Sequence, residues 1–449
     1  MKRNELLLFG LSVRNVTMPH VESFLAENGL RVAEIDAEAL LHSFDAEMTR
    51  GLAGAPDALP MIPAFLTVDR PVPIDTPVAV IDAGGTHLRV ATVWFDAQGK
   101  PHIEDYARHR MPGTQGALSA DAFYAALADF AAPVARRGKA VGFCFSYPAE
   151  VTPDCDARLL RWTKQIQAPD VVGTRVGSTL RECLARRNCD RPVTVLNDTA
   201  ATLLAGKSAG VAGRYSSFVG FILGTGTNTA YVESHANIRK RRDLTPNGAM
   251  IVNIESGSFA KVPQSRFDRL FDAGTVDPGA YTFEKMLAGA YLGGLGATIL
   301  REAAKAGLFT PATAVAIAAM PPLSTPDLDR FSQDPHRPPA IFAAVPFTDD
   351  DRRTALDLCL PVYTRAALFT AVAIAAAAIR SGAGADPLHP IAITIDGTTY
   401  YRTLTASFST RVQDHLRAFL APRRIHYELL HIEEAPLIGA AVAGLTLKS

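Results

Sequence analysis

Residues 78–94 read VAVIDAGGTHLRVATVW, and this stretch indicates the fold class of the chain. Residues 78–81 and 88–94 are short apolar runs rich in β-branched side chains, and Ala83-Gly84-Gly85 lies between them. Such a pattern predicts two strands joined by a glycine turn. Strands of this kind alternate with helical patterns along the rest of the chain, which predicts an α/β protein with mixed sheets.

The turn at 82–86 has two counterparts, because Gly224-Thr-Gly-Thr227 and Asp396-Gly-Thr-Thr399 also follow apolar strands. The periodicity of the chain predicts the remaining elements. Further strands are expected at 140–145, 193–196, 218–223, 229–233, 250–254 and 391–395. Helices are expected at 21–52, 120–135, 176–187 and 283–304, with another beginning at Asp198. The proline-dotted passage 56–77 indicates a linker or a chain crossing between lobes.

The composition of the 449 residues excludes several classes of protein. Apolar residues make up 48% of the chain, and 45 basic side chains balance 45 acidic ones. A neutral chain argues against nucleic acid or an anionic membrane as a partner.

The five cysteines are odd in number and lack CxxC spacing, so neither a disulfide framework nor a zinc site is favoured. A reducing compartment fits this cysteine use, and we expect a cytoplasmic protein. The apolar stretch 366–379 is shorter than the ~20 residues that cross a bilayer, so it predicts a buried helix.

Two of the glycine turns could hold phosphate groups. In Asp82-Ala-Gly-Gly-Thr86 and in Gly224-Thr-Gly-Thr-Asn228, the absence of side chains opens the backbone N–H groups to an anion. Asp82 could also hold a hydrated Mg²⁺. The alternative is an ordinary hairpin turn, in which Gly-Gly pairs are common. Two such loops together favour a nucleotide with several phosphates.

Asp198 follows the predicted strand 193–196, together with Asn197. A carboxylate at the C-terminal end of a sheet strand faces the crevice in which α/β proteins bind ligands. There it could accept the proton of a hydroxyl nucleophile. The alternative is a helix N-cap, because a helix is expected to start at this point, and on local evidence the cap is favoured.

Other polar side chains in the chain could bind a polar ligand. Ser146, Thr163 and Lys164 offer hydroxyl and ammonium donors, although each by itself also suits a turn or a solvated surface. Glu255 follows the strand 250–254 and could face the same crevice as Asp198. Glu284 lies near the start of a predicted helix, where a carboxylate is favoured by the helix dipole in any case.

From about residue 47 to residue 445, the chain resembles the hexokinases best known from eukaryotes. The resemblance is to one catalytic unit of that family. The motifs that carry this resemblance are, in order, LPMIP (59–63), IDAGGTHLRV (81–90), GFCFSYP (142–148), WTK (162–164), LNDT (196–199), LGTGTN (223–228), NIE (253–255), DPG (277–279) with FEKM (283–286), and IDGT (395–398). The resemblance implies a two-lobed actin-like ATPase (ribonuclease H-like) fold with an interlobe cleft. It implies a small lobe of 68–196 plus 437–449, and a large lobe of 1–67 plus 197–436.

The resemblance also implies an activity, the transfer of the ATP γ-phosphate to the 6-hydroxyl of glucose or a related hexose. Asp198 would take the hydroxyl proton, and Lys164 would help to neutralise the phosphoryl group. Side chains that would bind the sugar are Ser146, Thr163, Lys164, Asn197, Asp198, Asn228, Glu255 and Glu284. Positions that would bind the nucleotide are Asp82, Gly84, Gly85, Thr86, Arg89, Gly224, Thr225, Gly226, Gly397 and Thr398, with Asp82 holding Mg²⁺ through water.

Some positions depart from the family pattern. His87, Ser256 and Gly294 replace an Asn, a Trp and a Glu that are usual in the family. In residues 433–440, EEAPLIGA stands where the family has a Gly-Ser-rich nucleotide turn, a change that bears on nucleotide binding rather than on sugar chemistry. Two alternatives follow, a hexose sensor with little turnover and a kinase that prefers mannose, fructose or an amino sugar.

Overall fold

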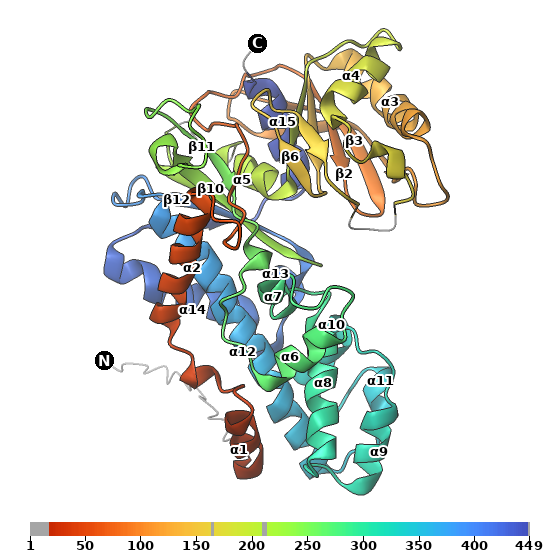
Figure 1. Ribbon diagram of the computed structural model, residues 1–449, viewed down its shortest axis with the longest axis vertical. Helices are drawn as coiled ribbons and strands as arrows, with labels where there is room; N and C mark the ends of the chain where they lie inside the picture. The colour runs from red at the N-terminus through yellow and green to blue at the C-terminus, as the bar shows by residue number, and fades with distance from the viewer. Residues whose placement is uncertain (1–17, 163–165, 209–212, 448–449) are drawn as a thin grey trace, which may run out of the picture.

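The computed structural model describes residues 18–162, 166–208 and 213–447. These residues form two lobes, each built on one main sheet (Figure 1). We call the part with the five-stranded sheet the small lobe and the part with the six-stranded sheet the large lobe.

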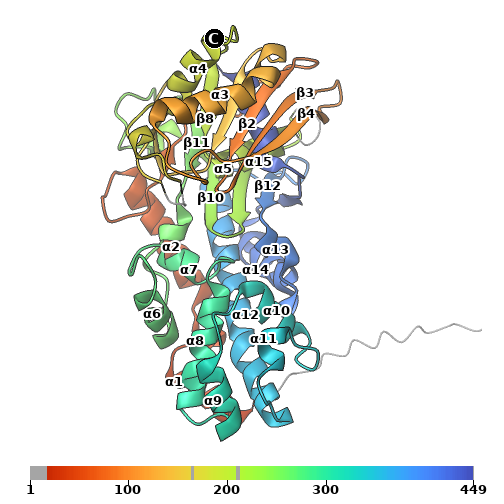
Figure 2. The same cartoon turned by 90° about the vertical axis from the view of Figure 1, so that its right-hand side faces the viewer.

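The sheet of the small lobe has the strand order β4-β3-β2-β5-β8. Its strands are β2 (Val78–Ala83), β3 (His87–Phe95), β4 (Pro101–Arg110), β5 (Val141–Phe145) and β8 (Val193–Leu196). β2 pairs antiparallel with β3 and parallel with β5, so the sheet is mixed, as predicted. The helices α3 (Ala120–Arg137) and α4 (Val176–Ala185) cover one face of it (Figure 2). A short hairpin, β6 (Ala149–Val151) and β7 (Ala157–Leu159), extends this lobe.

Both faces of β2 are buried, which explains its unbroken apolar run. Ala79 and Ile81 belong to the core beneath α3 and α4. Val78 and Val80 point to the opposite face and belong to a second core with the helix α15 (Ala435–Thr446). Successive side chains of a strand face opposite sides of its sheet, so a strand buried on both faces needs apolar residues at every position.

The sheet of the large lobe has the order β1-β11-β10-β9-β12-β13. Its strands are β1 (Ile62–Pro63), β9 (Ser217–Leu223), β10 (Thr227–Ser234), β11 (Ala249–Asn253), β12 (Ile391–Asp396) and β13 (Tyr427–Leu430). β12 runs parallel to both of its neighbours, and the other pairs are antiparallel. The helices below this sheet include α6 (Arg266–Ala273), α9 (Pro311–Ala319), α10 (Thr325–Gln333), α11 (Ala340–Ala343), α13 (Thr398–Arg402) and α14 (Phe408–Leu420).

The apolar stretch 366–379 lies within α12 (Asp349–Arg380), the long central helix of the large lobe. By length and composition α12 could cross a membrane, but 89% of its most apolar window is buried inside the protein. The prediction of a buried helix is therefore confirmed. The helix extends upstream of the apolar stretch because Thr348 and Asp351 form a capping box at its start.

Two predicted helices are wrong in their continuity. The stretch 21–52 contains α1 (Pro19–Glu27) and α2 (Ala37–Leu52), because Gly29 takes a left-handed φ of 72° and Asp36 caps the second helix. The stretch 283–304 contains α7 (Thr282–Lys285) and α8 (Leu292–Lys305). Between α7 and α8, the N–H groups of Gly289 and Ala290 donate to the carbonyls of Gly224 and Thr225. These N–H groups therefore make no helical hydrogen bonds, and the helix is interrupted there.

Two helices join the lobes. α5 (Asp198–Ser208) packs on α15, and their backbones approach so closely that a Cβ on Gly439 would lie 1.7 Å from the carbonyl oxygen of Ala201. One hydrophobic core runs from β2 through α15 and α5 to β11. The predicted boundaries between the lobes at 67/68, 196/197 and 436/437 stay a prediction, because the packing is continuous there.

Candidate active site

The turn at 84–86 joins β2 to β3 and is a true hairpin, closed by a bond of 3.1 Å from the Gly84 N–H to the His87 carbonyl. It is also tied to the segment after β5, because the Tyr147 hydroxyl donates to the Gly84 carbonyl at 2.6 Å. Gly84 and Gly85 are partly exposed, and Thr86 is exposed. The hairpin interpretation is therefore correct for the backbone, while the glycine edge and the Thr86 hydroxyl stay open to a ligand.

Asp82 lies at the end of β2 and is 2% exposed. Its carboxylate forms an ion pair with Arg89, the residue directly opposite on β3. Arg89 also pairs with Glu434, at 2.5 Å from Nη1 to Oε2, just before α15. Burial raises the pKa of Asp82. The positive charge of Arg89 opposes this rise, and the negative charge of Asp198 adds to it. Arg89 thus links the first turn to the segment 433–437.

Asn197 and Asp198 have separate roles in the local structure. The Asn197 carbonyl accepts the N–H of Ala201, and its side-chain Oδ1 accepts the N–H of Thr199 at 2.8 Å. Asn197 is therefore the residue that caps α5. Within the part of the chain that the structure describes, the Asp198 carboxylate makes one contact, of 3.3 Å, with the hydroxyl of Thr199. It is half-buried and is not needed as the cap.

Asp198 lies among other carboxyl groups. Its charge adds to the burial that raises the pKa of Asp82, of Glu255 and of Asp396. These groups come from the end of β2, from the turn after β11 and from the end of β12. The fold therefore brings together acidic residues that are far apart in the sequence, around the carboxylate that was predicted as a base.

The second turn, 224–227, is held by the segment around α7. The N–H of Thr227 donates to Glu284 Oε2 at 2.9 Å, and a Cβ on Gly226 would lie 2.6 Å from that oxygen. The backbone of Gly224 receives the bond from Gly289 described above, while Thr225 stays exposed. Gly226 allows the close approach of Glu284, and the Thr225 hydroxyl stays open to a ligand.

The third turn, at 397–398, lies against the second. Gly397 has a φ of 111°, and a Cβ there would lie 2.3 Å from the carbonyl oxygen of Leu223. Thr398 begins α13 and is exposed, whereas the hydroxyl of Thr399 donates to the Gly224 carbonyl at 2.8 Å. Thr399 was not among the predicted residues. Its role depends on a carbonyl 175 positions away, for which the sequence contains no local signal.

The two glutamates of the predicted sugar site are both fixed by donors. Glu255 has a left-handed φ of 59°, and its Oε1 accepts from the side-chain amides of Asn228 at 2.9 Å and Asn253 at 2.6 Å. Glu284 also accepts from the hydroxyl of Tyr291 at 3.2 Å. Burial raises the pKa of both carboxyl groups, more than their donors lower it. A left-handed non-glycine residue is costly and is typical of a functional position.

Ser146 lies just after β5, with its N–H bonded to the carbonyl of Ala83 at 3.3 Å, so it is beside the first turn. Thr163 and Lys164 lie outside the described residues. The neighbouring Trp162 is fixed, because its indole N–H donates to the Ala168 carbonyl at 2.8 Å and its ring packs edge-on against Tyr147 at 4.8 Å.

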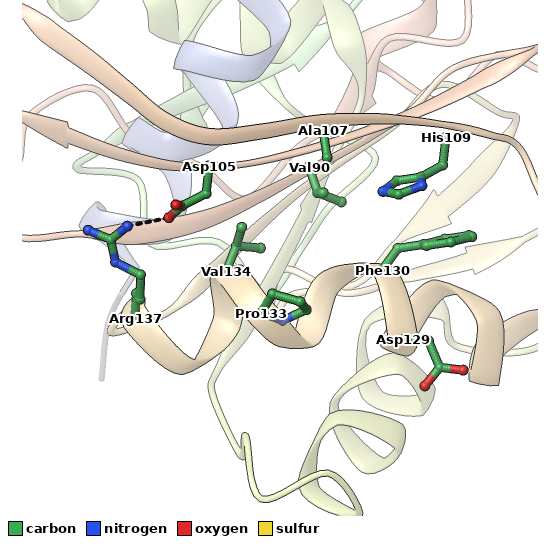
Figure 3. Close-up of a pocket in the computed structure, with 9 residues that line it drawn as sticks. All are labelled: Val90, Asp105, Ala107, His109, Asp129, Phe130, Pro133, Val134 and Arg137. Carbon is green, nitrogen blue, oxygen red and sulfur yellow. Dashed lines mark hydrogen bonds and ion pairs between the residues drawn. The ribbon is translucent and has the colours of Figure 1, made fainter.

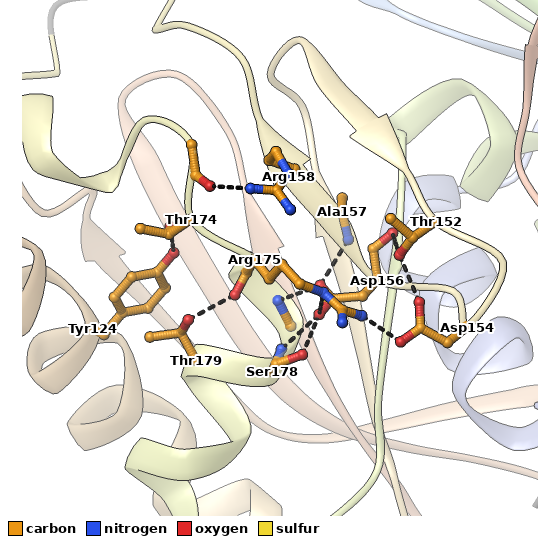
Figure 4. Close-up of polar contacts among 12 residues, drawn as sticks. Tyr124, Thr152, Asp154, Asp156, Ala157, Arg158, Thr174, Arg175, Ser178 and Thr179 are labelled. Atoms are coloured by element: carbon orange, nitrogen blue, oxygen red, sulfur yellow. Dashed lines mark hydrogen bonds and ion pairs between the residues drawn. The ribbon is translucent and has the colours of Figure 1, made fainter.

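A buried carboxylate, Asp156, supports this side of the small lobe (Figure 4). It accepts from the N–H of Ala157 at 2.7 Å, of Gly177 at 2.6 Å and of Ser178 at 2.9 Å, and it also pairs with Arg175. Asp156 therefore binds β7 to the start of α4. The hairpin that leads from Ser146 to Trp162 is fixed by this contact.

A surface groove of about 330 Å³ lies between α3 and the strands β3 and β4 (Figure 3). Its walls include the stacked rings of His109 and Phe130 and the ion pair of Arg137 with Asp105. None of the predicted site residues lines it. The groove is therefore separate from the candidate active site.

Comparisons with known proteins agree with this geometry. Two family models, both described as hexokinase, match residues 21–208 and 218–446. The chain is 34% identical to hexokinase-5 of Oryza sativa subsp. japonica over 310 residues, which cover 64% of this chain and 60% of that protein. It is 30% identical to hexokinase-1 of the same plant over 379 residues, 77% of this chain and 73% of that protein. The chain thus spans about three fifths of the first of these relatives.

A solved structure of hexokinase from Schistosoma mansoni in complex with glucose is similar to the fold. Its TM-score is 0.75 at 24% identity, and the match covers 95% of this chain and 99% of that one. This likeness confirms the predicted two-lobed actin-like ATPase fold.

Proposed function

The chain belongs to the hexokinase family, and from this premise we propose that it transfers the γ-phosphate of ATP to the 6-hydroxyl of glucose or a closely related hexose. The observation that carries the proposal is the state of Asp198. Because Asn197 caps α5, the Asp198 carboxylate is left available among residues that suit a sugar and a polyphosphate. A residue that served only as a helix cap would have its oxygen engaged with the backbone.

The sugar would be bound by the two fixed glutamates and their amide partners. Carboxylate oxygens accept hydrogen bonds from hydroxyl groups, and Asn228 can donate as well as accept. Glu255 and Glu284 belong to separate segments held by Asn253 and Tyr291, so their positions do not depend on the ligand. Such preformed partners make a buried polyol favourable, because each hydroxyl that leaves water finds a partner.

In the chemical step, Asp198 would take the proton as the sugar 6-oxygen bonds to the γ-phosphorus. The bond from that phosphorus to the bridging β–γ oxygen breaks, and ADP leaves with the electron pair. The proton then passes from Asp198 to solvent. Phosphoryl transfer depends mainly on positioning and charge stabilisation, and Lys164 would contribute charge to the transferred group.

The turns at 84–86, 224–227 and 397–398 would hold the nucleotide. Among the residues that the structure describes, no three His, Cys, Asp or Glu side chains group closely enough to hold a metal ion by themselves. The surplus of negative charge around Asp82 and Asp198 nevertheless suits a cation, and Asp82 would hold Mg²⁺ through water. When bound, Mg²⁺ supplies neutralising charge for the phosphates.

The test is a panel of glucose, mannose, fructose and glucosamine with Mg-ATP, read as ADP release, in the wild type and in Asp198→Ala. We expect turnover with at least one hexose, and a loss of roughly 10²–10⁴-fold in kcat in the variant. Unchanged activity in Asp198→Ala would show that another group is the base.

We also propose a cytoplasmic location, which is supported by five cysteines that are all buried and free. Cell fractionation tests it.

A second function, a hexose sensor with little turnover, is favoured by the segment 433–437. Ala435, Pro436 and Leu437 are buried in the first turn of α15, and Glu434 is engaged with Arg89. No hydroxyl from these three residues is offered to a nucleotide. Calorimetry that shows tight glucose binding, together with background formation of hexose phosphate from every nucleoside triphosphate and from pyrophosphate, would establish the sensor.

A further inference from the structure

We propose that Arg161 and Tyr281 form a clasp between the lobes that positions the hexose side of the site. Nη2 of Arg161 donates to the Tyr281 hydroxyl at 2.5 Å. Arg161 lies just after β7 in the small lobe, and Tyr281 lies directly before α7 in the large lobe. The inference rests on the proposed hexose phosphorylation, and it adds two positioning residues to that site.

The small-lobe end of the clasp is rigidly held. On one side of Arg161, the N–H of Leu160 donates to the Pro148 carbonyl at 2.9 Å. On the other side, Trp162 is bonded to Ala168 and packed against Tyr147. Tyr147 in turn is bonded to the Gly84 carbonyl of the first turn. The backbone that carries Arg161 is therefore part of the scaffold that carries Ser146 and the turn at 84–86.

The large-lobe end is equally constrained. Tyr281 has a left-handed backbone, with φ 51° and ψ 39°, which a bulky residue rarely adopts. Its carbonyl accepts the N–H of Lys285 at 3.1 Å. The buried Lys285 ammonium binds Asp272 at 2.6 Å and the Thr275 hydroxyl at 2.9 Å. Tyr281 therefore moves as one unit with α7.

The clasp consequently joins two rigid pieces that carry sugar-site residues from opposite lobes. Ser146 is attached to one piece, and Glu284, three residues after Tyr281, belongs to the other. The bond forms where the lobes are close enough for the Arg161 guanidinium to reach the Tyr281 hydroxyl, so its free energy favours this arrangement over a more open one.

The rival explanation is an incidental surface contact, since an exposed hydrogen bond contributes little to stability. The two explanations differ in what the bond is coupled to. A clasp affects hexose binding and lobe separation, and its two residues act as one unit. An incidental contact affects neither property.

The experiment compares Tyr281→Phe, Arg161→Met and the double variant with the wild type. Each single variant removes the bond while keeping the bulk of the side chain. We expect the KM for hexose to rise roughly tenfold in each, as for the loss of a bond to a charged donor, with a smaller effect on kcat and on the KM for ATP. The double variant should be no worse than either single variant, because both remove the same bond.

Matched controls are Arg158→Met and Tyr215→Phe. Arg158 donates to the Gly173 carbonyl within the small lobe, and the Tyr215 hydroxyl donates to Glu428 within the large lobe. Neither bond joins the lobes, so both controls should match the wild type. Small-angle X-ray scattering with and without glucose gives a second readout, in which the clasp variants should be more extended than the wild type and the two controls.

Unchanged hexose KM in the variants, or additive effects in the double variant, would overturn the clasp while leaving the proposed function intact. If the wild type binds glucose without turnover, the proposed function fails. The clasp is then judged by calorimetric glucose affinity and by scattering in the same variants. A wild type that binds no hexose at all overturns both proposals.

Discussion

The separation of roles between Asn197 and Asp198 makes a quantitative prediction. Asn197→Ala removes the bond of 2.8 Å to the Thr199 N–H. Thr199 is fully buried, so water cannot replace the lost acceptor. We expect a loss of about 1–2 kcal/mol in the free energy of unfolding, the upper part of the range for a lost N-cap.

Asp198→Ala should behave in the opposite way. Among the described residues the carboxylate makes one contact, of 3.3 Å, and its charge raises the pKa of Asp82, Glu255 and Asp396 through like-charge repulsion. Its removal should therefore change the stability by less than about 0.5 kcal/mol, or increase it slightly. The kcat with hexose and Mg-ATP should nevertheless fall as stated above, because the base is lost.

The assay is urea unfolding of the ligand-free protein, followed by fluorescence, beside ADP release from the same samples. Asn197→Ser is the matched control, since serine also caps helices and should restore most of the stability lost in Asn197→Ala. The hexose KM should be raised in both Asn197→Ala and Asn197→Ser, because both variants lack the amide predicted to bind the sugar. If Asp198→Ala destabilises the protein as much as Asn197→Ala does, Asp198 is the structural cap and its assignment as the base loses its support.

Three further predictions concern the groups around this pair. Gly397→Ala would place a Cβ 2.3 Å from the Leu223 carbonyl oxygen, at a φ of 111°. We therefore expect the variant to lose about 2–4 kcal/mol in the free energy of unfolding and its KM for ATP to rise more than its KM for hexose. An unaltered KM for ATP would contradict the nucleotide role of this turn. Glu255→Gln should raise the melting temperature at neutral pH, because burial raises the pKa of Glu255 and thus penalises its charged form in the folded protein. The gain should vanish as the pH falls below the ordinary pKa of 4.5, where the wild-type group is protonated in both the folded and the unfolded state. A gain that persists in acid would show another cause. Its hexose affinity should fall at the same time. Lys285→Met leaves Asp272 without its buried cation, which should lower the free energy of unfolding in urea by about 2–3 kcal/mol. The hexose KM should also rise, because Glu284 is the neighbouring residue. Wild-type values for both quantities would refute the anchoring role of Lys285.

Several features of the fold follow from the sequence by itself. The strands β2, β3, β5, β8, β9 and β12 lie where apolar runs predicted them, and each glycine turn follows its strand. These features are local, since a strand buried on both faces needs a continuous apolar run and a tight turn needs glycine. The predicted order of motifs also led to the family that the comparisons show.

The breaks within the helices could not be predicted in this way. The apolar pattern of 283–304 continues through residues 286–291, yet the N–H groups of Gly289 and Ala290 bond to the carbonyls of Gly224 and Thr225. Those carbonyls lie more than sixty positions away in the sequence. A periodic pattern records which face of a helix is buried, but it does not record whether a distant carbonyl competes for the helical N–H groups.

The roles of Asn197 and Asp198 were decided only by the tertiary structure. Both residue types can cap a helix, so the sequence predicts a cap at this point without showing which side chain reaches the Thr199 N–H. The bond from Thr399 to Gly224 and the contact of Arg161 with Tyr281 likewise join segments that are distant in the chain. The sequence determined which chemical groups are present and which turns carry them. The packing of the two lobes determined which of those groups meet, because hydrogen bonds depend on distances in space that no local pattern encodes.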